Sequence, residues 1–262
     1  MSGPLPSLLR NLKQQLLITE TQIGRVMEHQ AAENQEPEII NKEPIEPQAS
    51  PLLPRNVVDL FIHPTKFFSS QIAIGKKPYF YFVTWCYGIC HIIDRIDRNI
   101  LRSNLGRPRQ GWEVLGPYLT ESWPDFWAFV LITGALAGLI LWSIGGWWYH
   151  VRLHWSGHSR PDPKLARLVF IYSSFVMALP TILVTLVQTV IYGNYQEAFS
   201  ADELWSSFVL LFPFWSSLVS YKGAMTLFEL NRARALMWFV ILPFIVYFFA
   251  FGIMIFLLTL IN

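Results

Sequence analysis

Charged residues are scarce in this sequence: Asp, Glu, Lys and Arg make up 15% of its 262 residues, and the formal net charge is +2. So small and dispersed a charge excludes the basic patch that nucleic-acid binding requires. The composition is instead 53% hydrophobic and 16% aromatic, which is typical of an integral membrane protein. The lipid bilayer is therefore the first partner that the sequence predicts.

Cysteine and histidine are also rare. Cys86 and Cys90 are four residues apart in an apolar run, so they would share one helix face and could not easily bridge each other. This excludes a disulfide scaffold. The six histidines are too few for the several histidine boxes of membrane desaturases and hydroxylases. No nucleophile elbow, phosphate loop or dinucleotide motif occurs, so we expect neither an enzyme nor a cofactor.

Five apolar stretches contain no Asp, Glu, Lys or Arg. A charge near the bilayer centre costs about 2.5–3.5 kcal/mol, and about 20 helical residues cross ~30 Å of hydrocarbon. We therefore expect an all-α, polytopic integral membrane protein with five transmembrane helices. The expected spans are about residues 78–93, 126–149, 169–192, 204–221 and 236–261. The first would rise only about 24 Å, so its flanking residues must help it to cross.

Helix ends can be predicted at two places. Asp162 followed by Pro163 is typical of an N-cap with a first-turn proline, and it should start the third span. Ser200 and Glu203 have the spacing of a capping box, and they should start the fourth.

Small residues and prolines mark expected helix-packing positions. Gly134 and Gly138 form a GxxxG step in the second span, where another helix backbone can approach closely. Packing inside the chain is favoured there over a dimer seam. A proline inside a span removes a backbone hydrogen bond and should kink the helix, unless it is simply an ordinary proline of a packed bundle. The prolines in the last three spans are Pro180, Pro213 and Pro243.

The positive charges are unequally distributed over the loops. The lead-in to the first span and the second and fourth loops carry Lys66, Lys76, Lys77, Arg152, Arg160, Lys164, Arg167, Lys222, Arg232 and Arg234. The opposite side carries Arg95, Arg98, Arg102, Arg107 and Arg109. The positive-inside rule therefore predicts a cytoplasmic N-terminus and a C-terminus outside. We expect the membrane to be the bacterial inner membrane or, alternatively, that of the eukaryotic ER or Golgi.

Two different segments precede the membrane domain, which is expected over residues 56–262. Residues 1–30 are predicted to form an amphipathic or coiled-coil helix, because apolar side chains recur over 5–29 at alternating spacings of four and three. The side chains expected to bind a protein partner or a second copy are Leu9, Leu12, Leu16 and Ile23. Residues 31–55 are acidic and proline-rich, which is typical of a disordered linker. The interrupted apolar stretch 57–74 should lie along the membrane surface.

Three histidines recur at i, i+4 and i+8 where the second span ends, namely His150, His154 and His158. A continued helix would stack them on one face with ligand-like spacing for a metal. Gly157 should break the helix before the third, and the neighbouring Arg152 is typical of a helix end at the membrane surface. Interfacial contacts are therefore favoured over a metal site.

The expected spans offer little for a proton or ion relay. Such transport usually leaves an ionisable group within a span, and the spans hold only His91, near the end of the first. Thr181, Thr185 and Thr189 follow one face of the third span, either as contacts between helices or as the lining of a narrow path. A small transporter or channel subunit for an uncharged or lipidic solute is therefore the alternative function.

Three segments resemble the Yip family, the five-span membrane proteins named for interaction with Ypt/Rab GTPases, and are most similar to its prokaryotic members. They are LFIHPTKFF with Pro64, Phe67 and Phe68; ARLVFIYSSFVMALPTIL with Tyr172, Ser173 and Pro180; and FWSSLVSYKGAMTLFELNRARAL with Trp215, Gly223 and Ala235. The resemblance covers about residues 57–260, and the DLYGP-type motif of the eukaryotic trafficking members is absent. It implies five spans, a cytoplasmic N-terminus, no catalytic residues, and a protein that recruits or organises partners and can shape the membrane.

Overall fold

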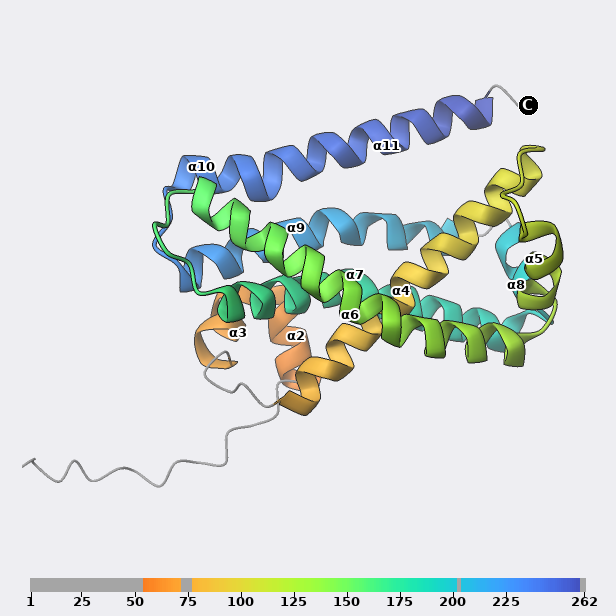
Figure 1. Cartoon of the computed structure of the whole chain (residues 1–262), viewed down its shortest axis with the longest axis horizontal. Helices are drawn as coiled ribbons and strands as arrows, with labels where there is room; N and C mark the ends of the chain where they lie inside the picture. The colour runs from red at the N-terminus through yellow and green to blue at the C-terminus, as the bar shows by residue number, and fades with distance from the viewer. Residues whose placement is uncertain (1–53, 72–76, 202–203, 260–262) are drawn as a thin grey trace, which may run out of the picture. The chain divides into compact units, whose positions relative to one another are not determined.

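The computed structural model describes residues 54–71, 77–201 and 204–259. All regular structure in these residues is helical, which confirms the all-α prediction for this part of the chain. The elements in chain order (Figure 1) are α2 (Pro54–Ile62), α3 (Pro64–Gln71), α4 (Lys77–Asn104), α5 (Trp112–Thr120), α6 (Trp123–Trp155), α7 (Pro163–Ile191), α8 (Tyr195–Ser200), the 3₁₀ helix η1 (Leu204–Leu211), α9 (Phe212–Leu227), α10 (Arg232–Leu236), the π-helix η2 (Met237–Ile241) and α11 (Leu242–Thr259).

Three of the described helices are long and apolar enough to cross a membrane. They are α6, α7 and the continuous helix Arg232–Phe249, which runs from α10 through η2 into α11. These three coincide with the second, third and fifth expected spans. The first expected span falls in α4 and the fourth in η1 and α9, and their crossing of the membrane stays a prediction.

α7 is the central helix of the bundle. Half of the most apolar 18-residue stretch of α7 is buried, against 17% of the corresponding stretches in α6 and in Arg232–Phe249. It contacts α4, α6 and α9. The outward faces of α6 and α11 expose large apolar side chains, among them Ile132, Ile140, Phe248 and Phe249. Lipid can cover such a surface, whereas water would make it unstable.

α4 extends well beyond the first expected span. It has 28 residues and is therefore about 42 Å long at 1.5 Å per residue. The prediction ended the span at residue 93 because charges follow. The helix continues since Ile96 and Ile100 are both buried at 2% exposure, while Asp94 pairs with Arg98 one turn later at 2.8 Å. Such an i,i+4 pair stabilises a helix surface.

α4 and α6 cross with their backbones in contact. A Cβ added to Gly88 of α4 would lie 1.9 Å from the Gly134 carbonyl oxygen and 2.5 Å from the Gly138 nitrogen, both of α6. The GxxxG step of α6 therefore lies against α4, inside the chain's own bundle.

One predicted helix start is confirmed and one is wrong. The Asp162 side chain caps α7 by accepting a hydrogen bond from the Lys164 backbone N–H at 2.8 Å, and Pro163 occupies the first turn. Ser200 does not start a helix but ends α8, and its hydroxyl donates to the Gln196 carbonyl at 2.8 Å. The prediction failed because Asn194 caps a separate short helix just before this point.

The three predicted proline positions lie in different settings. Pro180 is inside α7. Pro213 is the second residue of α9, which directly follows the 3₁₀ helix η1. Pro243 is the second residue of α11, which directly follows the π-helix η2. A proline ring clashes with the carbonyl four residues earlier in an α-helix, and a 3₁₀ or π turn moves that carbonyl. The irregular turns therefore accommodate two of the prolines.

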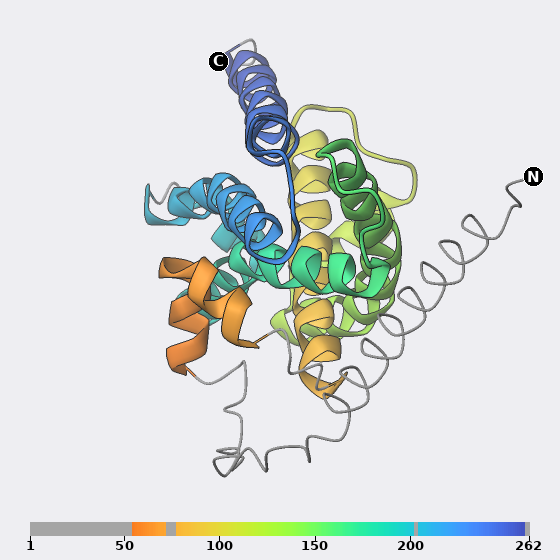
Figure 2. The ribbon, with the colours of Figure 1, turned by 90° about the vertical axis from the view of Figure 1, so that its left-hand side faces the viewer.

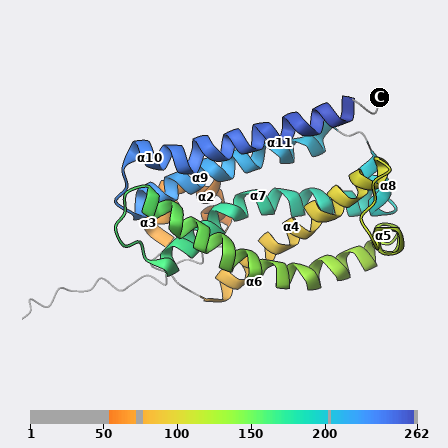
Figure 3. The same cartoon turned by 45° about the horizontal axis from the view of Figure 1, so that its top comes forward.

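The loops alternate between two ends of the bundle. The Asn231 N–H donates to the Ser156 carbonyl at 3.0 Å, so the α6–α7 and α9–α10 loops lie side by side. These loops are near α3, whereas α5 and α8 contact each other at the opposite end (Figure 3). The loops that the charge count grouped together are therefore neighbours in space.

Candidate functional site

The short helices α2 and α3 form a hairpin that packs against α7 and α9 (Figure 2). Leu60, Phe67 and Phe68 are at most 2% exposed. The Phe67 ring meets the Phe68 ring edge-on at 5.4 Å and the Tyr172 ring of α7 at 5.5 Å. We call this contact of the hairpin with α7 and α9 the hairpin junction.

A glycine on α9 makes the hairpin junction close. A Cβ added to Gly223 would lie 2.7 Å from a Phe68 ring carbon and 2.8 Å from Val169 Cγ1. Both distances are shorter than a carbon–carbon contact of about 3.5–4.0 Å. Any larger residue at this position would therefore push α3, α7 or α9 apart.

Two hydrogen bonds link α9 to its neighbours at the hairpin junction. The Trp215 indole N–H donates to the Phe61 carbonyl of α2 at 2.9 Å. The Ser216 hydroxyl donates to the Ser173 carbonyl of α7 at 2.8 Å. Both bonds join segments far apart in sequence, so they help to align the hairpin and the two longer helices.

The outer face of the hairpin combines exposed apolar and charged side chains. Val58 and Ile62 are 52% and 62% exposed. Lys66 Nζ lies 3.0 Å from an Asp59 carboxylate oxygen, and this pair joins α3 to α2. An amphipathic surface of this kind suits the boundary between water and lipid, which is what the sequence predicts for residues 57–74.

Arg152 lies near the end of α6 and packs over aromatic rings of the bundle. Its guanidinium carbon is 4.7 Å from the centre of the Phe239 ring and 5.2 Å from that of Tyr149. Both rings are fully buried, and the Tyr149 hydroxyl donates to the Ser220 carbonyl at 3.0 Å. The Arg152 Nε is buried without a hydrogen-bond partner among the described residues. A helix-end arginine was expected to reach the membrane surface, but a cation over ring faces is stabilised by them instead.

Arg167 of α7 makes the same kind of contact. Its guanidinium carbon is 5.1 Å from the centre of the Trp142 ring of α6. Its stem lies over Gly146, where an added Cβ would meet Arg167 Cγ at 2.3 Å. Glycine on α6 thus makes room for a long side chain of α7. Neither Arg152 nor Arg167 forms an ion pair with any described residue.

The three sequence-predicted histidines contact backbone atoms and neighbouring loops. His150 Nε2 is 3.1 Å from the Pro161 carbonyl oxygen, and His154 Nδ1 is 3.3 Å from that of His158. α6 ends at Trp155, and Gly157 adopts a φ of +104°, which glycine tolerates best. His158 is consequently off the helix. Among residues 54–71, 77–201 and 204–259, no three His, Cys, Asp or Glu side chains form a group that could hold a metal ion.

Replacing His150 and His154 together with glutamine should leave the protein folded and its metal content unchanged. Both imidazoles contact carbonyl oxygens, so the expected change in stability is within about 1 kcal/mol. Melting in detergent and elemental analysis measure the two quantities. Stoichiometric zinc or iron in the unsubstituted protein, lost in the double variant, would contradict this.

At the opposite end of the bundle, the carboxyl group of Asp97 and the phenol hydroxyl of Tyr195 form a hydrogen bond. The Tyr195 hydroxyl of α8 donates to an Asp97 oxygen of α4 at 2.5 Å. The Tyr195 ring stacks on Phe126 at 4.1 Å and meets Trp123 edge-on at 5.6 Å. Asp97 lies one turn beyond the expected first span. Burial raises the pKa of Asp97 from 3.8 to about 7, and the Tyr195 hydrogen bond lowers it in part.

The stability of the protein should consequently fall as the pH rises from about 4 to about 7. The folded pKa of Asp97 is above the ordinary value of 3.8, so the folded state binds the proton more tightly than the unfolded state does. The contribution is fully present below pH 4 and is lost as the pH passes through about 7. Asp97→Asn should flatten the dependence of the melting temperature on pH over this range. An unchanged slope in Asp97→Asn would contradict the assignment.

The sequence-predicted residues thus have different outcomes. Gly134 and Gly138 lie in one helix contact, the three histidines do not converge, and the partner-binding set of Leu9, Leu12, Leu16 and Ile23 lies outside the described residues. Sequence reasoning missed Asp97, although its spacing from the buried Ile93 and Ile100 was a signal that it faces inward.

No protein-family model, curated protein or solved structure matches this chain. The described residues define an all-helical protein with three helices able to cross a membrane. Together with the apolar outer surface, this indicates a membrane protein.

Proposed function

We propose that the chain is a five-span integral membrane protein of the Yip type, which recruits or organises partner proteins and has no enzymatic activity. The hairpin junction carries this proposal, because the three Yip-like segments meet there. Phe67 of the first segment contacts Tyr172 of the second. Phe68 of the first lies against the Gly223 position of the third. Contacts among all three segments support a likeness of fold to the Yip family.

The arrangement of α4 and of η1 with α9 supports five spans rather than three. α4 packs against α6 and α7, and α9 packs against α7 and α11. The expected spans therefore lie side by side in one bundle, as neighbouring transmembrane helices do. The adjacent α6–α7 and α9–α10 loops are the ones that carry the larger positive charge, which supports a cytoplasmic location for this end.

A reporter that is active only outside the cytoplasm should give signal when fused after Asn262 and none when fused before Met1. An odd number of spans with a cytoplasmic N-terminus requires this result. The opposite pattern would mean that the arginines of the first loop determine the orientation. No signal at either end would mean that both ends are cytoplasmic and that the number of spans is even. The first expected span would then not cross the membrane.

The recruiting role is proposed for the N-terminal helix expected over residues 1–30. It is joined through residues 31–55 to the hairpin, which lies at the end with the larger positive charge. A flexible chain of about 25 residues has an r.m.s. reach of about 25–30 Å. Such a tether would let the helix search for partners close to the membrane.

Photo-cross-linking in native membranes tests this role, with the probe on a cysteine placed at Leu9. The full-length protein should give adducts that contain protein. Leu12→Asp with Leu16→Asp should abolish them, because each carboxylate would lose water in an apolar seam. Gln14→Asp with Gln15→Asp adds the same charge off the seam and should retain them. Adducts with lipid alone, or none, would contradict recruitment.

The alternative function is transport of an uncharged or lipidic solute, for which the threonines of α7 would have to line a path. Their hydrogen bonds favour a structural role over such a lining. The hydroxyls of Thr181, Thr185 and Thr189 donate to the carbonyls four residues earlier in the same helix, at 2.8–3.1 Å. Thr189 also accepts from the Trp127 indole N–H at 3.0 Å. Hydroxyls used in this way favour contacts between helices.

A further inference from the structure

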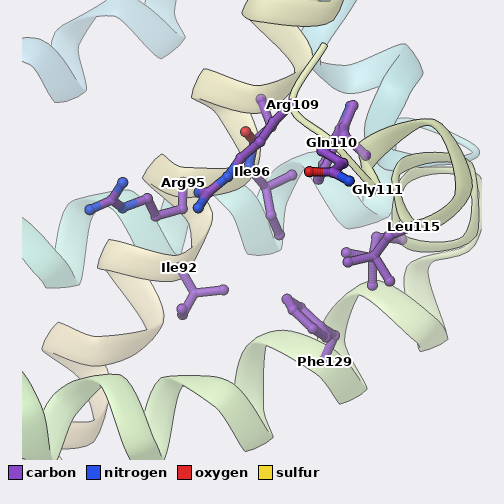
Figure 4. A pocket seen from close by; sticks show the side chains of 11 residues that line it. Ile92, Arg95, Ile96, Arg109, Gln110, Gly111, Leu115 and Phe129 are labelled. Atoms are coloured by element: carbon purple, nitrogen blue, oxygen red, sulfur yellow. The ribbon is translucent and has the colours of Figure 1, made fainter.

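A cavity of about 320 Å³ opens between α4, α5 and α6, at the end of the bundle away from the hairpin junction. Its walls include Ile92 of α4, Leu115 of α5 and Phe129 of α6, which point toward one space from three helices (Figure 4). Arg95 lies on α4, and Arg109 and Gln110 come from the loop before α5. The cavity therefore combines an apolar wall with hydrogen-bond donors at its rim.

The two arginines have no anionic partner among the described residues. The carboxylates on the same stretch of α4 are already engaged: Asp94 pairs with Arg98 at 2.8 Å, and Asp97 accepts from the Tyr195 hydroxyl. No ion pair or side-chain hydrogen bond joins Arg95 or Arg109 to any part of the chain that the structure describes. Figure 4 shows Arg109 extending toward α4, and the Arg95 side chain extending from α4 away from Leu115 and Phe129. Guanidinium groups at the edge of a cavity favour an anion, and phosphate oxygens can accept their paired N–H donors.

The apolar face of α5 indicates where the cavity opens. Val114, Leu115 and Tyr118 are 83%, 43% and 62% exposed, whereas Leu119 and Thr120 of the same helix are buried. Apolar side chains that a short helix turns outward at the end of a membrane bundle suit the interface between lipid and water. Lipid on this face of α5 would put the cavity at the depth of the lipid headgroups.

We propose that this cavity binds one anionic phospholipid. Arg95 and Arg109 hold the phosphate, Gln110 donates to the headgroup, and the upper part of an acyl chain lies along Leu115 and Phe129. A free phosphate would leave this apolar wall in water. A choline headgroup would bring a further positive charge next to the two arginines. The inference needs only the membrane domain, so it does not depend on partner recruitment.

Native mass spectrometry of the full-length protein in a neutral detergent tests the proposal, with phosphatidylglycerol and phosphatidylcholine as probes. Arg95→Gln with Arg109→Gln should weaken phosphatidylglycerol binding by about tenfold or more, since each arginine near an anionic surface contributes about fivefold. The matched control is Arg102→Gln with Arg107→Gln, which removes the same charge from the same region outside the cavity. The control should bind within about twofold of the unsubstituted protein. Arg109→Gln alone, on an exposed loop, repeats the test without altering α4.

A second measurement separates a lipid from a free phosphate. Leu115→Asn should weaken phosphatidylglycerol binding severalfold, because the ligand loses its apolar contact, and inorganic phosphate at millimolar concentration should not displace the lipid. Displacement by phosphate with no effect of Leu115→Asn would overturn the lipid assignment. Equal losses in the two double arginine variants would overturn the site, and equal binding of phosphatidylcholine would overturn its charge selectivity. The melting temperature without added lipid, measured for every variant, confirms that each is folded.

Discussion

Replacing Gly88 with leucine should prevent the membrane domain from assembling. Even a single Cβ at this position would lie 1.9 Å from a backbone oxygen and 2.5 Å from a backbone nitrogen of α6. Overpacking against flexible side chains costs about 1–3 kcal/mol, and backbone atoms at a helix crossing cannot move aside as side chains do. A loss of at least about 3 kcal/mol is therefore expected. The yield of monodisperse protein in mild detergent and its melting temperature measure the effect.

Gly252→Leu is the matched control for this substitution. An added Cβ at Gly252 of α11 meets no atom within 4 Å, so a leucine there should face lipid. The control should retain the yield and the melting temperature of the unsubstituted protein. Similar behaviour of the two variants, whether both fold or both fail, would show that the contact between α4 and α6 is not as described.

The second large effect is expected for Phe68→Ala, at the hairpin junction. The Phe68 side chain is fully buried, and truncation of a buried phenylalanine costs about 3–5 kcal/mol through lost contacts and the cavity left behind. Because the hairpin has few other buried side chains, the loss should free it from α7 and α9 while the longer helices stay packed. Hydrogen exchange should then increase over residues 54–71 and stay unchanged over α7.

Phe249→Ala removes the same side chain from a lipid-facing position and serves as the control. Phe249 is 72% exposed, so its truncation should leave exchange at the hairpin unaltered. Slow exchange over residues 54–71 in Phe68→Ala would mean that the hairpin junction is not what holds the hairpin. The support that this junction gives to the Yip-type proposal would then be lost.

The parts of the fold that follow from hydrophobicity could be predicted from the sequence. α6 and α7 coincide with long stretches without charge, and the cap at Asp162 has a local cause that the residues themselves reveal. The GxxxG step at Gly134 and Gly138 could be recognised as a close contact, but its partner could not. Gly88 is about 50 residues away and has no motif of its own, so only the folded chain brings the three glycines together.

Of the two features that were missed, the continuation of α4 had a local signal, whereas the position of Arg152 depends on contacts between distant segments. The rule against charge in a membrane ended the first span before Asp94, although a stripe of buried isoleucines continues to Ile100. Arg152 stands at the end of an apolar run, where arginines usually reach the surface. Its position over Phe239 depends on a helix that begins about 80 residues later. A single sequence holds no signal for such a pairing.

The hairpin junction also has a consequence for biosynthesis. Phe61, whose carbonyl accepts the Trp215 hydrogen bond, is 154 residues earlier in the chain. At about 5–20 residues per second, a ribosome needs about 8 to 30 s to cover that distance. Phe67 and Phe68 are therefore made long before α9 exists to bury them. During that interval the bilayer surface is the nearest apolar environment, so the hairpin would wait in the membrane interface until the last helices arrive.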